Sequence, residues 1–363
     1  MTEIKMVDLQ GQYLRIKGEV DSAIQSVINS TAFIQGKEVK QFASSLSTYL
    51  GGAHVVTCGN GTDALQIAMM ALGLKPGDEV ILPVHTYVAT AEVTALLGLT
   101  PVFVDVEADT FNIDISQVES KITTRTKAIV PVHLYGQCAD MDPLIAVASK
   151  HNLYIIEDAA QSFGAKYNDK FSGTIGHVGT TSFFPTKNLG CFGDGGAIMT
   201  RSQDLAEDMR IIANHGQKKK YHHDRIGVNS RLDTLQAAIL SVKLKYLGEY
   251  ERKRNEVASY YDKHLESVVI PVRAKNSTHV FHQYTIKAER RDSLKDFLQA
   301  QGIPSIIYYP VPLHHQKAYM QTGKTFPVTE QLSREVLSLP MHTEITEEQL
   351  DYICRNINSF YRG

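Results

Sequence analysis

Short apolar runs alternate with longer amphipathic segments between about residues 54 and 200. Seven runs have the length and β-branched character of strands, and they cover residues 55–57, 79–83, 101–105, 128–132, 154–157, 181–184 and 196–199. The segments between them, such as 62–72 and 86–97, repeat apolar residues with a period near 3.6, which predicts helices. This alternation predicts βαβ units, and therefore an α/β fold with a mostly parallel central sheet flanked by helices.

The pattern changes after Leu232, where a helical run rich in Ala, Leu, Lys and Glu continues to about residue 265. The remainder predicts a strand at 283–286, a helix at 292–301, a loop rich in Gly, Pro, Tyr and His at 302–315, and a terminal helix at 346–360. We therefore predict a large domain at 1–240 and a smaller α+β C-terminal domain at 241–363.

Composition restricts the classes of function. The 363 residues carry 37 Lys and Arg against 39 Asp and Glu, a net charge of −2, so no global field indicates a nucleic acid or a membrane as partner. The four cysteines are scattered without a C-x-x-C pair, which argues against a bound metal and against a disulfide scaffold. The N-terminus resembles no signal peptide, and no apolar run approaches roughly 20 residues, so we expect a cytoplasmic protein.

Lys187 is the leading candidate for a catalytic residue. It is an isolated lysine that follows the apolar run 181–184, and a glycine-rich stretch comes after it. Burial disfavours the ammonium ion and lowers the pKa of a lysine, which makes its amine available to condense with an aldehyde or ketone as a Schiff base. A single lysine of this kind is more often an ordinary loop residue, so the interpretation depends on its neighbours.

Two strand ends supply groups that suit an anion. Gly61 and Thr62 open a helix directly after a strand, where backbone N–H groups and the helix dipole favour a phosphate, although a plain N-cap is the simpler reading. Ser182, five residues before Lys187, offers a second phosphate donor. All lie where the carboxyl edge of the sheet is expected, the edge at which open α/β sheets bind ligands.

Two further residues suit an aromatic ring. Asp158 ends an apolar strand, and a carboxylate there stabilises a protonated ring nitrogen, unless it only caps the next turn. Tyr87 follows another strand and offers a flat face for stacking, although tyrosines are more often plain core or surface residues. Together with Lys187 and the anion cradle, these groups describe a site for pyridoxal phosphate bound as a lysine Schiff base.

Seven motifs strengthen this interpretation because they occur in the order of a known family. They lie at residues 60–65, 86–91, 133–137, 157–162, 182–187, 193–196 and 227–233. In these motifs the chain resembles the DegT/DnrJ/EryC1/StrS sugar aminotransferases, which are fold-type I pyridoxal-phosphate enzymes. The resemblance covers nearly the whole chain and implies a nucleotide-sugar transaminase. A minority of the family has histidine at the position of Lys187 and acts as dehydratases, so lysine favours transamination.

The resemblance also implies a role for individual residues. Lys187 would carry the cofactor and shuttle a proton, Asp158 would pair with the pyridine nitrogen, and Gln161 would lie near the ring hydroxyl. The phosphate would be held by Gly61, Thr62, Ser182 and, from the other subunit, Asn229. The resemblance thus implies an obligate homodimer with shared active sites.

The loop at 215–223 bears on the substrate. Alone it reads as a solvated basic loop, but with 135–140 and 229–240 it resembles the UDP-2-acetamido-2-deoxy-3-oxo-D-glucuronate aminotransferases. That substrate carries a carboxylate, which Arg231 would bind, and a diphosphate, near which His222 and His223 would lie. One departure is that Tyr308 and Tyr309 stand where that subfamily has His-Tyr, so a cationic contact is lost while a hydrogen-bond donor remains.

Other functions stay open at this point. A neutral dTDP-3-keto-6-deoxyhexose is the closest competing substrate, although it offers fewer negative groups for Arg231 and the basic loop to bind. A dinucleotide-dependent oxidoreductase is disfavoured because no G-x-G-x-x-G follows a strand. A noncatalytic relative would be expected to lose Lys187 or Asp158. We expect L-glutamate as the amino donor and surface polysaccharide biosynthesis, including lipopolysaccharide, as the pathway.

Overall fold

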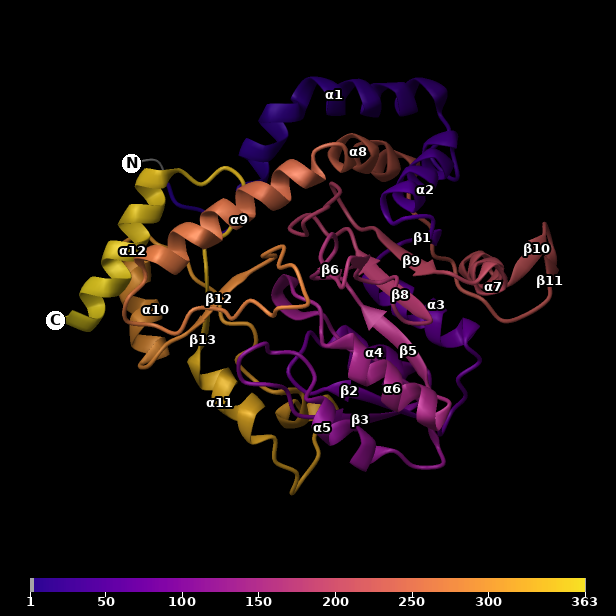
Figure 1. The fold of residues 1–363 in the computed structure, drawn as a ribbon. Coiled ribbons are helices and arrows are strands. Elements are labelled where there is room, and N and C mark those ends of the chain that lie inside the picture. The colour runs from indigo at the N-terminus through magenta and orange to yellow at the C-terminus, as the bar shows by residue number, and fades with distance from the viewer. Residues whose placement is uncertain (1–2, 363) are drawn as a thin grey trace.

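A seven-stranded sheet forms the centre of the molecule in the computed structural model, which describes residues 3–362 (Figure 1). The strand order is β1-β9-β8-β5-β4-β2-β3, and β9 runs antiparallel to both of its neighbours while the other pairs are parallel. The strands are β1 (His54–Cys58), β2 (Glu79–Pro83), β3 (Thr100–Val104), β4 (Thr126–Ile129), β5 (Tyr154–Asp158), β8 (Val178–Ser182) and β9 (Gly196–Thr200). The predicted mostly parallel sheet is confirmed.

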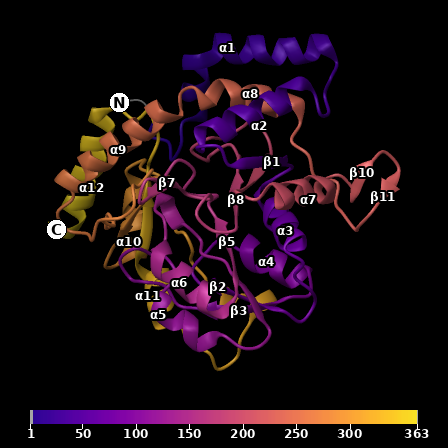
Figure 2. The same ribbon diagram turned by 45° about the vertical axis from the view of Figure 1, so that its right-hand side comes forward.

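Helices cover both faces of this sheet, which explains why its strands are apolar runs rather than alternating ones. Val56 and Ile198 pack with α3 (Gly61–Ala71) and α7 (Gln203–Ala213), whereas Val55 and Met199 pack with α2 (Lys37–Tyr49) and α8 (Thr234–Leu244). The remaining helices of this part are α1 (Leu9–Ser30), α4 (Ala89–Leu96), α5 (Ile115–Val118) and α6 (Met141–His151). In Figures 1 and 2, α1 lies along α8 at the top of the molecule.

The predicted long helix after Leu232 is two helices. It breaks between α8 and α9 (Leu247–His264), and the two halves serve different cores. Leu240 of α8 packs under the central sheet, whereas Val257 and Tyr261 of α9 pack in the C-terminal core. The apolar periodicity of the sequence continues through the break, because both helices have an apolar face. Periodicity therefore predicts one helix where the structure has two.

The C-terminal part is built on a two-stranded antiparallel sheet of β12 (Tyr284–Lys287) and β13 (Val336–Leu339). Its other helices are α10 (Arg291–Ala300), α11 (Pro327–Glu335) and α12 (Glu347–Arg362). The predicted strand at 283–286 and helices at 292–301 and 346–360 match β12, α10 and α12, whereas β13 and α11 had no counterpart in the predictions. The domain division after residue 240 stays a prediction.

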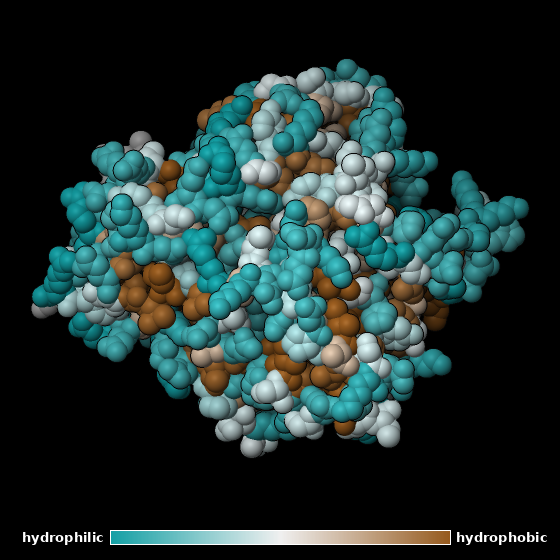
Figure 3. Space-filling view, viewed as in Figure 1, coloured by the Kyte–Doolittle hydropathy of each residue, from teal (hydrophilic) through white to brown (hydrophobic). Residues whose placement is uncertain are grey.

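Two hairpins complete the fold, formed by β6 (Lys166–Tyr167) with β7 (Lys170–Phe171) and by β10 (Gln217–Lys219) with β11 (His222–His223). The second hairpin projects beyond α7 and is hydrophilic in the space-filling view (Figures 1 and 3). Within residues 3–362, no helix combines the length and the apolar character that crossing a membrane requires.

Candidate active site

The predicted phosphate residues meet at the carboxyl edge of the sheet. Ser182 is the last residue of β8, and Gly61 is the first residue of α3, directly after β1. A Cβ atom added to Gly61 would lie 2.8 Å from Cβ of Ser182, so this helix start and this strand end are in direct contact. Only glycine permits that approach, which explains why a glycine begins the helix.

The start of α3 leaves backbone donors available. Asn60 caps the helix by accepting a hydrogen bond from the Asp63 amide (2.8 Å), and the first intrahelical bond is donated by Ala64 N to Asn60 O (3.1 Å). The amides of Gly61 and Thr62 precede that bond, as the first N–H groups of any helix do. Together with the positive end of the helix dipole they form an anion-binding position.

Asp158 lies at the end of β5, and only 7% of its surface is exposed. Its Oδ2 accepts a hydrogen bond from the Thr90 hydroxyl of α4 (2.8 Å), and its Oδ1 accepts one from the Ala160 amide (3.2 Å). A buried carboxylate with one donor on each oxygen keeps acceptor capacity on both, since each carboxylate oxygen has two lone pairs. The position and the geometry therefore suit pairing with a cationic ring nitrogen.

The neighbouring acid, Glu157, is fully buried and saturated. It accepts hydrogen bonds from the amides of Gly173 (2.8 Å), Ile175 (2.7 Å) and Gly176 (2.6 Å), and its Oε2 lies 2.9 Å from His133 Nε2. These bonds hold the loop after β7 against β5. Glu157 is thus a structural acid, whereas Asp158 beside it faces the site.

Lys187 lies in the turn that follows β8, where its amide donates to Phe184 O (2.8 Å). Burial lowers the pKa of its amine from 10.5 to about 8, although the negative charge of Asp158 acts in the opposite direction. The same positive charge of Lys187, with that of Arg254, adds to burial in lowering the pKa of His282 well below its usual value. The side chain of Lys187 is half-buried, and its lowered pKa agrees with the partly desolvated lysine expected from the sequence; it lies in the electrostatic field of Asp158.

Several buried polar atoms near the predicted site lack a hydrogen-bond partner within residues 3–362. These atoms are His85 Nδ1, Thr86 Oγ1, Asn188 Oδ1 and His282 Nδ1. His85 and Thr86 precede Tyr87 in the sequence, and Asn188 follows Lys187. The positive charge of Lys187 acts on His282. Unpartnered buried polar atoms are rare and costly, so they indicate a bound polar group or ordered water. Their position agrees with a polar cofactor held against Lys187.

Gln161 and four tyrosines form one wall of the site. Gln161 Nε2 donates to the Tyr309 hydroxyl (3.0 Å), and its Oε1 accepts from the Tyr135 amide (2.9 Å). The rings of Tyr87 and Tyr309 lie 6.3 Å apart, and 57% of Tyr87 is exposed, which leaves a ring face open. Tyr135 donates to Tyr308 O and thereby holds the C-terminal loop against the central sheet.

Sequence reasoning missed Tyr135 and Thr90 as site residues. Both lie inside motifs that were recognised, at 133–137 and 86–91, but their contacts run to Tyr308 and Asp158, which are far away in sequence. Periodicity cannot show such pairings. A polar residue at a buried position of the apolar helix α4 is the one local signal that pointed to Thr90.

The residues predicted to act across a subunit interface stand apart from this group. Asn229 is exposed, and His222 and His223 lie on the projecting hairpin, where His223 Nδ1 is 2.8 Å from His215 O. None of the three has a hydrogen bond or ion pair to Lys187, Asp158 or Ser182 in the described part of the chain. However, Ser230 beside Asn229 binds the Gly59 amide (2.8 Å) and Asp63 (2.6 Å), which anchors this loop at the start of α3.

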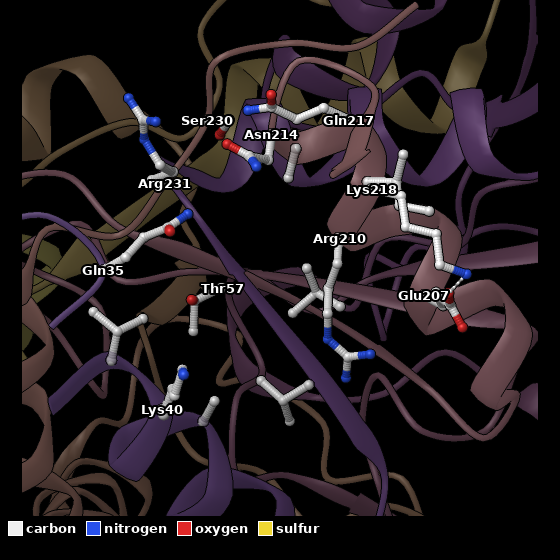
Figure 4. A pocket seen from close by; sticks show the side chains of 16 residues that line it. Gln35, Lys40, Thr57, Glu207, Arg210, Asn214, Gln217, Lys218, Ser230 and Arg231 are labelled. Carbon is white, nitrogen blue, oxygen red and sulfur yellow. Dashed lines mark ion pairs between the residues drawn. The ribbon is translucent and has the colours of Figure 1, made fainter. Parts of the chain in front are cut away.

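Arg231 lines a separate cavity of about 450 Å³ between α2, β1 and α7 (Figure 4). Its floor is apolar, and it includes Val39, Val55 and Val56. Four cationic side chains surround it, and they are Lys40, Arg210, Lys218 and Arg231. Lys218 pairs with Glu207 (2.5 Å), whereas the other three form no ion pair among residues 3–362. The cavity therefore carries an uncompensated positive charge.

His314, His315 and Glu330 are the one group of possible metal ligands in the described chain, with ligand atoms within 4.8 Å of one another. The hydrogen bonds explain this group without a metal. Glu330 Oε1 accepts from the Phe326 amide (3.0 Å) at the start of α11 and lies 3.1 Å from His314 Nε2. The contacts form a helix cap, and the predicted lack of a metal stays a prediction.

Residues 15–358 match the DegT/DnrJ/EryC1/StrS aminotransferase family. The chain belongs to this family. It is 49% identical over 353 residues, 97% of this chain and 98% of the relative, to UDP-2-acetamido-2-deoxy-3-oxo-D-glucuronate aminotransferase from Pseudomonas aeruginosa. It is 48% identical over 367 residues, 99% of each chain, to the "Pleiotropic regulatory protein" of Geobacillus stearothermophilus. It is 41% identical over 352 residues, 95% and 93% of the chains, to dTDP-3-amino-3,4,6-trideoxy-alpha-D-glucose transaminase from Streptomyces venezuelae.

Solved structures agree with this assignment. A DegT DnrJ EryC1 StrS aminotransferase from Brucella abortus has a TM-score of 0.97 and 43% identity, over 99% of this chain and 100% of that one. The protein ntda from Bacillus subtilis, solved with bound cofactor PMP, has a TM-score of 0.93 and 31% identity, over 100% of this chain and 86% of that one. The predicted fold and activity class are confirmed: the chain is a sugar aminotransferase, and its cofactor is pyridoxal phosphate.

Proposed function

We propose that this cytoplasmic enzyme transfers an amino group from L-glutamate to C3 of UDP-2-acetamido-2-deoxy-3-oxo-D-glucuronate in surface polysaccharide biosynthesis, including that of lipopolysaccharide. The observation that carries the proposal is the cationic cavity, because Arg231, which is expected to bind the carboxylate, lines it together with Lys218 of the loop at 215–223. Both candidate nucleotide sugars carry a diphosphate, so the sugar carboxylate is the group that distinguishes them. Its additional negative charge matches three unpaired cations better than an uncharged sugar ring does. The 49% identity with the Pseudomonas aeruginosa relative supports the same choice.

The residues of the site fit the cofactor. Pyridoxal phosphate supplies an electron sink that stabilises negative charge at the substrate carbon. Lys187 binds it covalently and then moves a proton at that carbon, for which a pKa of about 8 is well matched. Asp158 holds the proton on the pyridine nitrogen, and Gly61, Thr62 and Ser182 bind the phosphate, with Tyr87 and Gln161 beside the ring.

We infer a homodimer in which each site is completed by the other subunit. Asn229 would reach the phosphate of the partner's cofactor, and Arg231 would reach the sugar carboxylate, with His222 and His223 near the diphosphate. The exposure of Asn229 and the projection of the hairpin from the body support this arrangement, since both leave side chains accessible to a second subunit (Figure 1). The anchoring of Ser230 to the start of α3 would hold the loop ready for the partner.

Tyr308 and Tyr309 would meet the sugar from within the same chain. Burial raises the pKa of both phenols, so both remain protonated donors at neutral pH. A neutral donor at Tyr308, where the glucuronate subfamily has histidine, favours the second candidate, a dTDP-3-keto-6-deoxyhexose. The 41% identity with the Streptomyces venezuelae relative supports that candidate as well.

A coupled assay distinguishes the two. The purified enzyme, reconstituted with pyridoxal phosphate, receives L-glutamate and either the UDP-3-keto-glucuronate or a dTDP-3-keto-hexose, and 2-oxoglutarate formation is measured. We expect kcat/KM to favour the glucuronate by at least about tenfold, the value of one good charge-assisted contact. Equal values, or a preference for the dTDP sugar, would refute the substrate assignment. Borohydride reduction followed by peptide mapping, with the label on Lys187, tests the site itself.

A further inference from the structure

Thr90 connects the helix α4 to the carboxylate of Asp158. Its side chain is fully buried, and its hydroxyl donates to Asp158 Oδ2 at 2.8 Å. The other oxygen, Oδ1, accepts from the Ala160 amide at 3.2 Å. Each oxygen thus has one protein donor, and the donor on Oδ2 is the only one of the two that a side-chain substitution removes.

These two hydrogen bonds fix the plane of the carboxylate. The terminal torsion of an aspartate is broad, so a carboxylate with a donor on one oxygen only turns about its bond with little resistance. Asp158 is 7% exposed, and bulk water does not replace a lost donor at such a position. Hydrogen bonds to an ionised acceptor are short and strong, so the bond from the Thr90 hydroxyl restricts rotation of the Asp158 carboxylate.

Thr90 is itself held firmly. Its backbone oxygen accepts a hydrogen bond from the Thr94 hydroxyl (2.8 Å), and Thr94 is also fully buried. The helix that carries them packs against α3 and β2, both of which reach the same edge of the sheet. A rigid support of this kind is what fixes a functional group in one geometry.

We propose that Thr90 is a positioning residue, which holds Asp158 Oδ2 in the orientation that keeps the pyridine nitrogen of the cofactor protonated. The proposal rests on the proposed role of Asp158 as the partner of that nitrogen. Thr90 is fully buried and its hydroxyl is used by Asp158, so it would act through that carboxylate. Its loss leaves a carboxylate that is present but misdirected, a defect different from the loss of the carboxylate itself.

The test compares Thr90→Val, which keeps the shape and removes the donor, with Thr90→Ser, which keeps the donor. Thr94→Val is the matched control, because it removes a buried hydroxyl one turn along the same helix without touching Asp158. Each holoenzyme is reconstituted with ¹⁵N-labelled pyridoxal phosphate, and the nitrogen resonance, kcat, KM and thermal midpoint are measured. For Thr90→Val we expect the resonance to move toward that of a neutral pyridine and kcat to fall about tenfold, with KM nearly constant.

Thr90→Ser should restore both readouts to nearly the wild-type values. Thr94→Val should leave the nitrogen resonance and kcat unchanged, because its hydroxyl binds only the Thr90 backbone oxygen. A Thr90→Val protein whose resonance and kcat match those of Thr94→Val overturns the proposal. If Thr90→Val does not fold, Thr90→Cys replaces it, because a thiol is a weaker hydrogen-bond donor. The cysteine variant must then have a lower kcat than Thr90→Ser, and its nitrogen resonance must lie closer to that of a neutral pyridine. A wild-type holoenzyme with a neutral pyridine would instead refute the role of Asp158, and with it the proposed function.

Discussion

The cofactor side and the substrate side of this enzyme differ in how much of their geometry one chain provides. Around Lys187 and Asp158, strand ends, helix starts and hydrogen bonds fix the side chains, of which Asp158 is buried and Lys187 is half-buried. Around Arg231 and the β10–β11 hairpin, cations are exposed and mostly unpaired (Figure 4). The difference indicates that one chain fixes the groups of the predicted cofactor site, whereas the cations that we propose for substrate binding lie on its surface.

This comparison predicts that substitution of Lys187 causes the largest loss of catalytic activity. Lys187→Ala removes both the covalent link and the proton carrier, so we expect kcat to fall by at least about a thousandfold, as for other nucleophilic groups that also transfer protons. Steady-state assays with saturating pyridoxal phosphate measure it. Lys187→Arg is the control that keeps the positive charge, and it should be equally inactive. A variant with more than a few per cent of the wild-type activity would contradict the assigned role.

Asp158→Asn should have the next largest effect. The amide keeps the shape but cannot stabilise a protonated pyridine, so we expect kcat to fall about a hundredfold or more, at the scale of several kcal/mol of lost electrostatic stabilisation. Cofactor retention, measured by equilibrium dialysis, should weaken much less, because the phosphate contacts remain. Unchanged turnover would exclude Asp158 from the chemistry.

Arg231 tests the other side of the comparison. Arg231→Met removes the charged group that we propose binds the sugar carboxylate, and we expect KM for the UDP-3-keto-glucuronate to rise about 30-fold while kcat changes little. Arg210→Met, in the same cavity, serves as the control for a general loss of positive charge. If kcat falls and KM stays constant, Arg231 acts in the reaction itself rather than in substrate binding, which would contradict the proposed separation of the cofactor side from the substrate side.

The pH dependence of cofactor binding gives the smallest expected effect. The pKa of Lys187 in the cofactor-free protein is about 8, so the neutral amine grows about tenfold between pH 7 and pH 9. The rate at which the apoenzyme captures pyridoxal phosphate, followed by stopped-flow absorbance, should rise by that factor and level off above pH 9. A rate that continues to climb toward pH 10.5 would show that the lysine is not desolvated.

Much of the fold and of the cofactor site was predictable because it is local in sequence. The strand that ends in Asp158 and the glycine that begins α3 are visible as an apolar run and a turn, and both follow from short-range physics. The strand predicted at 181–184 lies at 178–182 instead, because Phe183 is buried beyond the strand end, where the turn toward Lys187 begins. In the sequence, an apolar residue that is buried in a turn cannot be distinguished from one that is buried in a strand.

The remainder depends on segments that meet only after folding. The Thr90 hydroxyl and Asp158 are 68 residues apart, and the cationic cavity draws Lys40, Arg210 and Arg231 from three separate elements. The break between α8 and α9 follows from the two cores on which they pack, not from any breaker residue between them. Such features are fixed by tertiary packing, which outweighs local propensity.

The two adjacent acids of β5 show how sensitive the enzyme is to strand register. Glu157 is saturated by His133 and three backbone amides, while Asp158 keeps acceptor capacity for a ligand. Because successive side chains of a strand point to opposite faces, a shift of β5 by one residue would exchange their surroundings. A single-codon deletion in β5 would therefore misplace both carboxylates at once, whereas a point substitution elsewhere on the strand leaves their register intact.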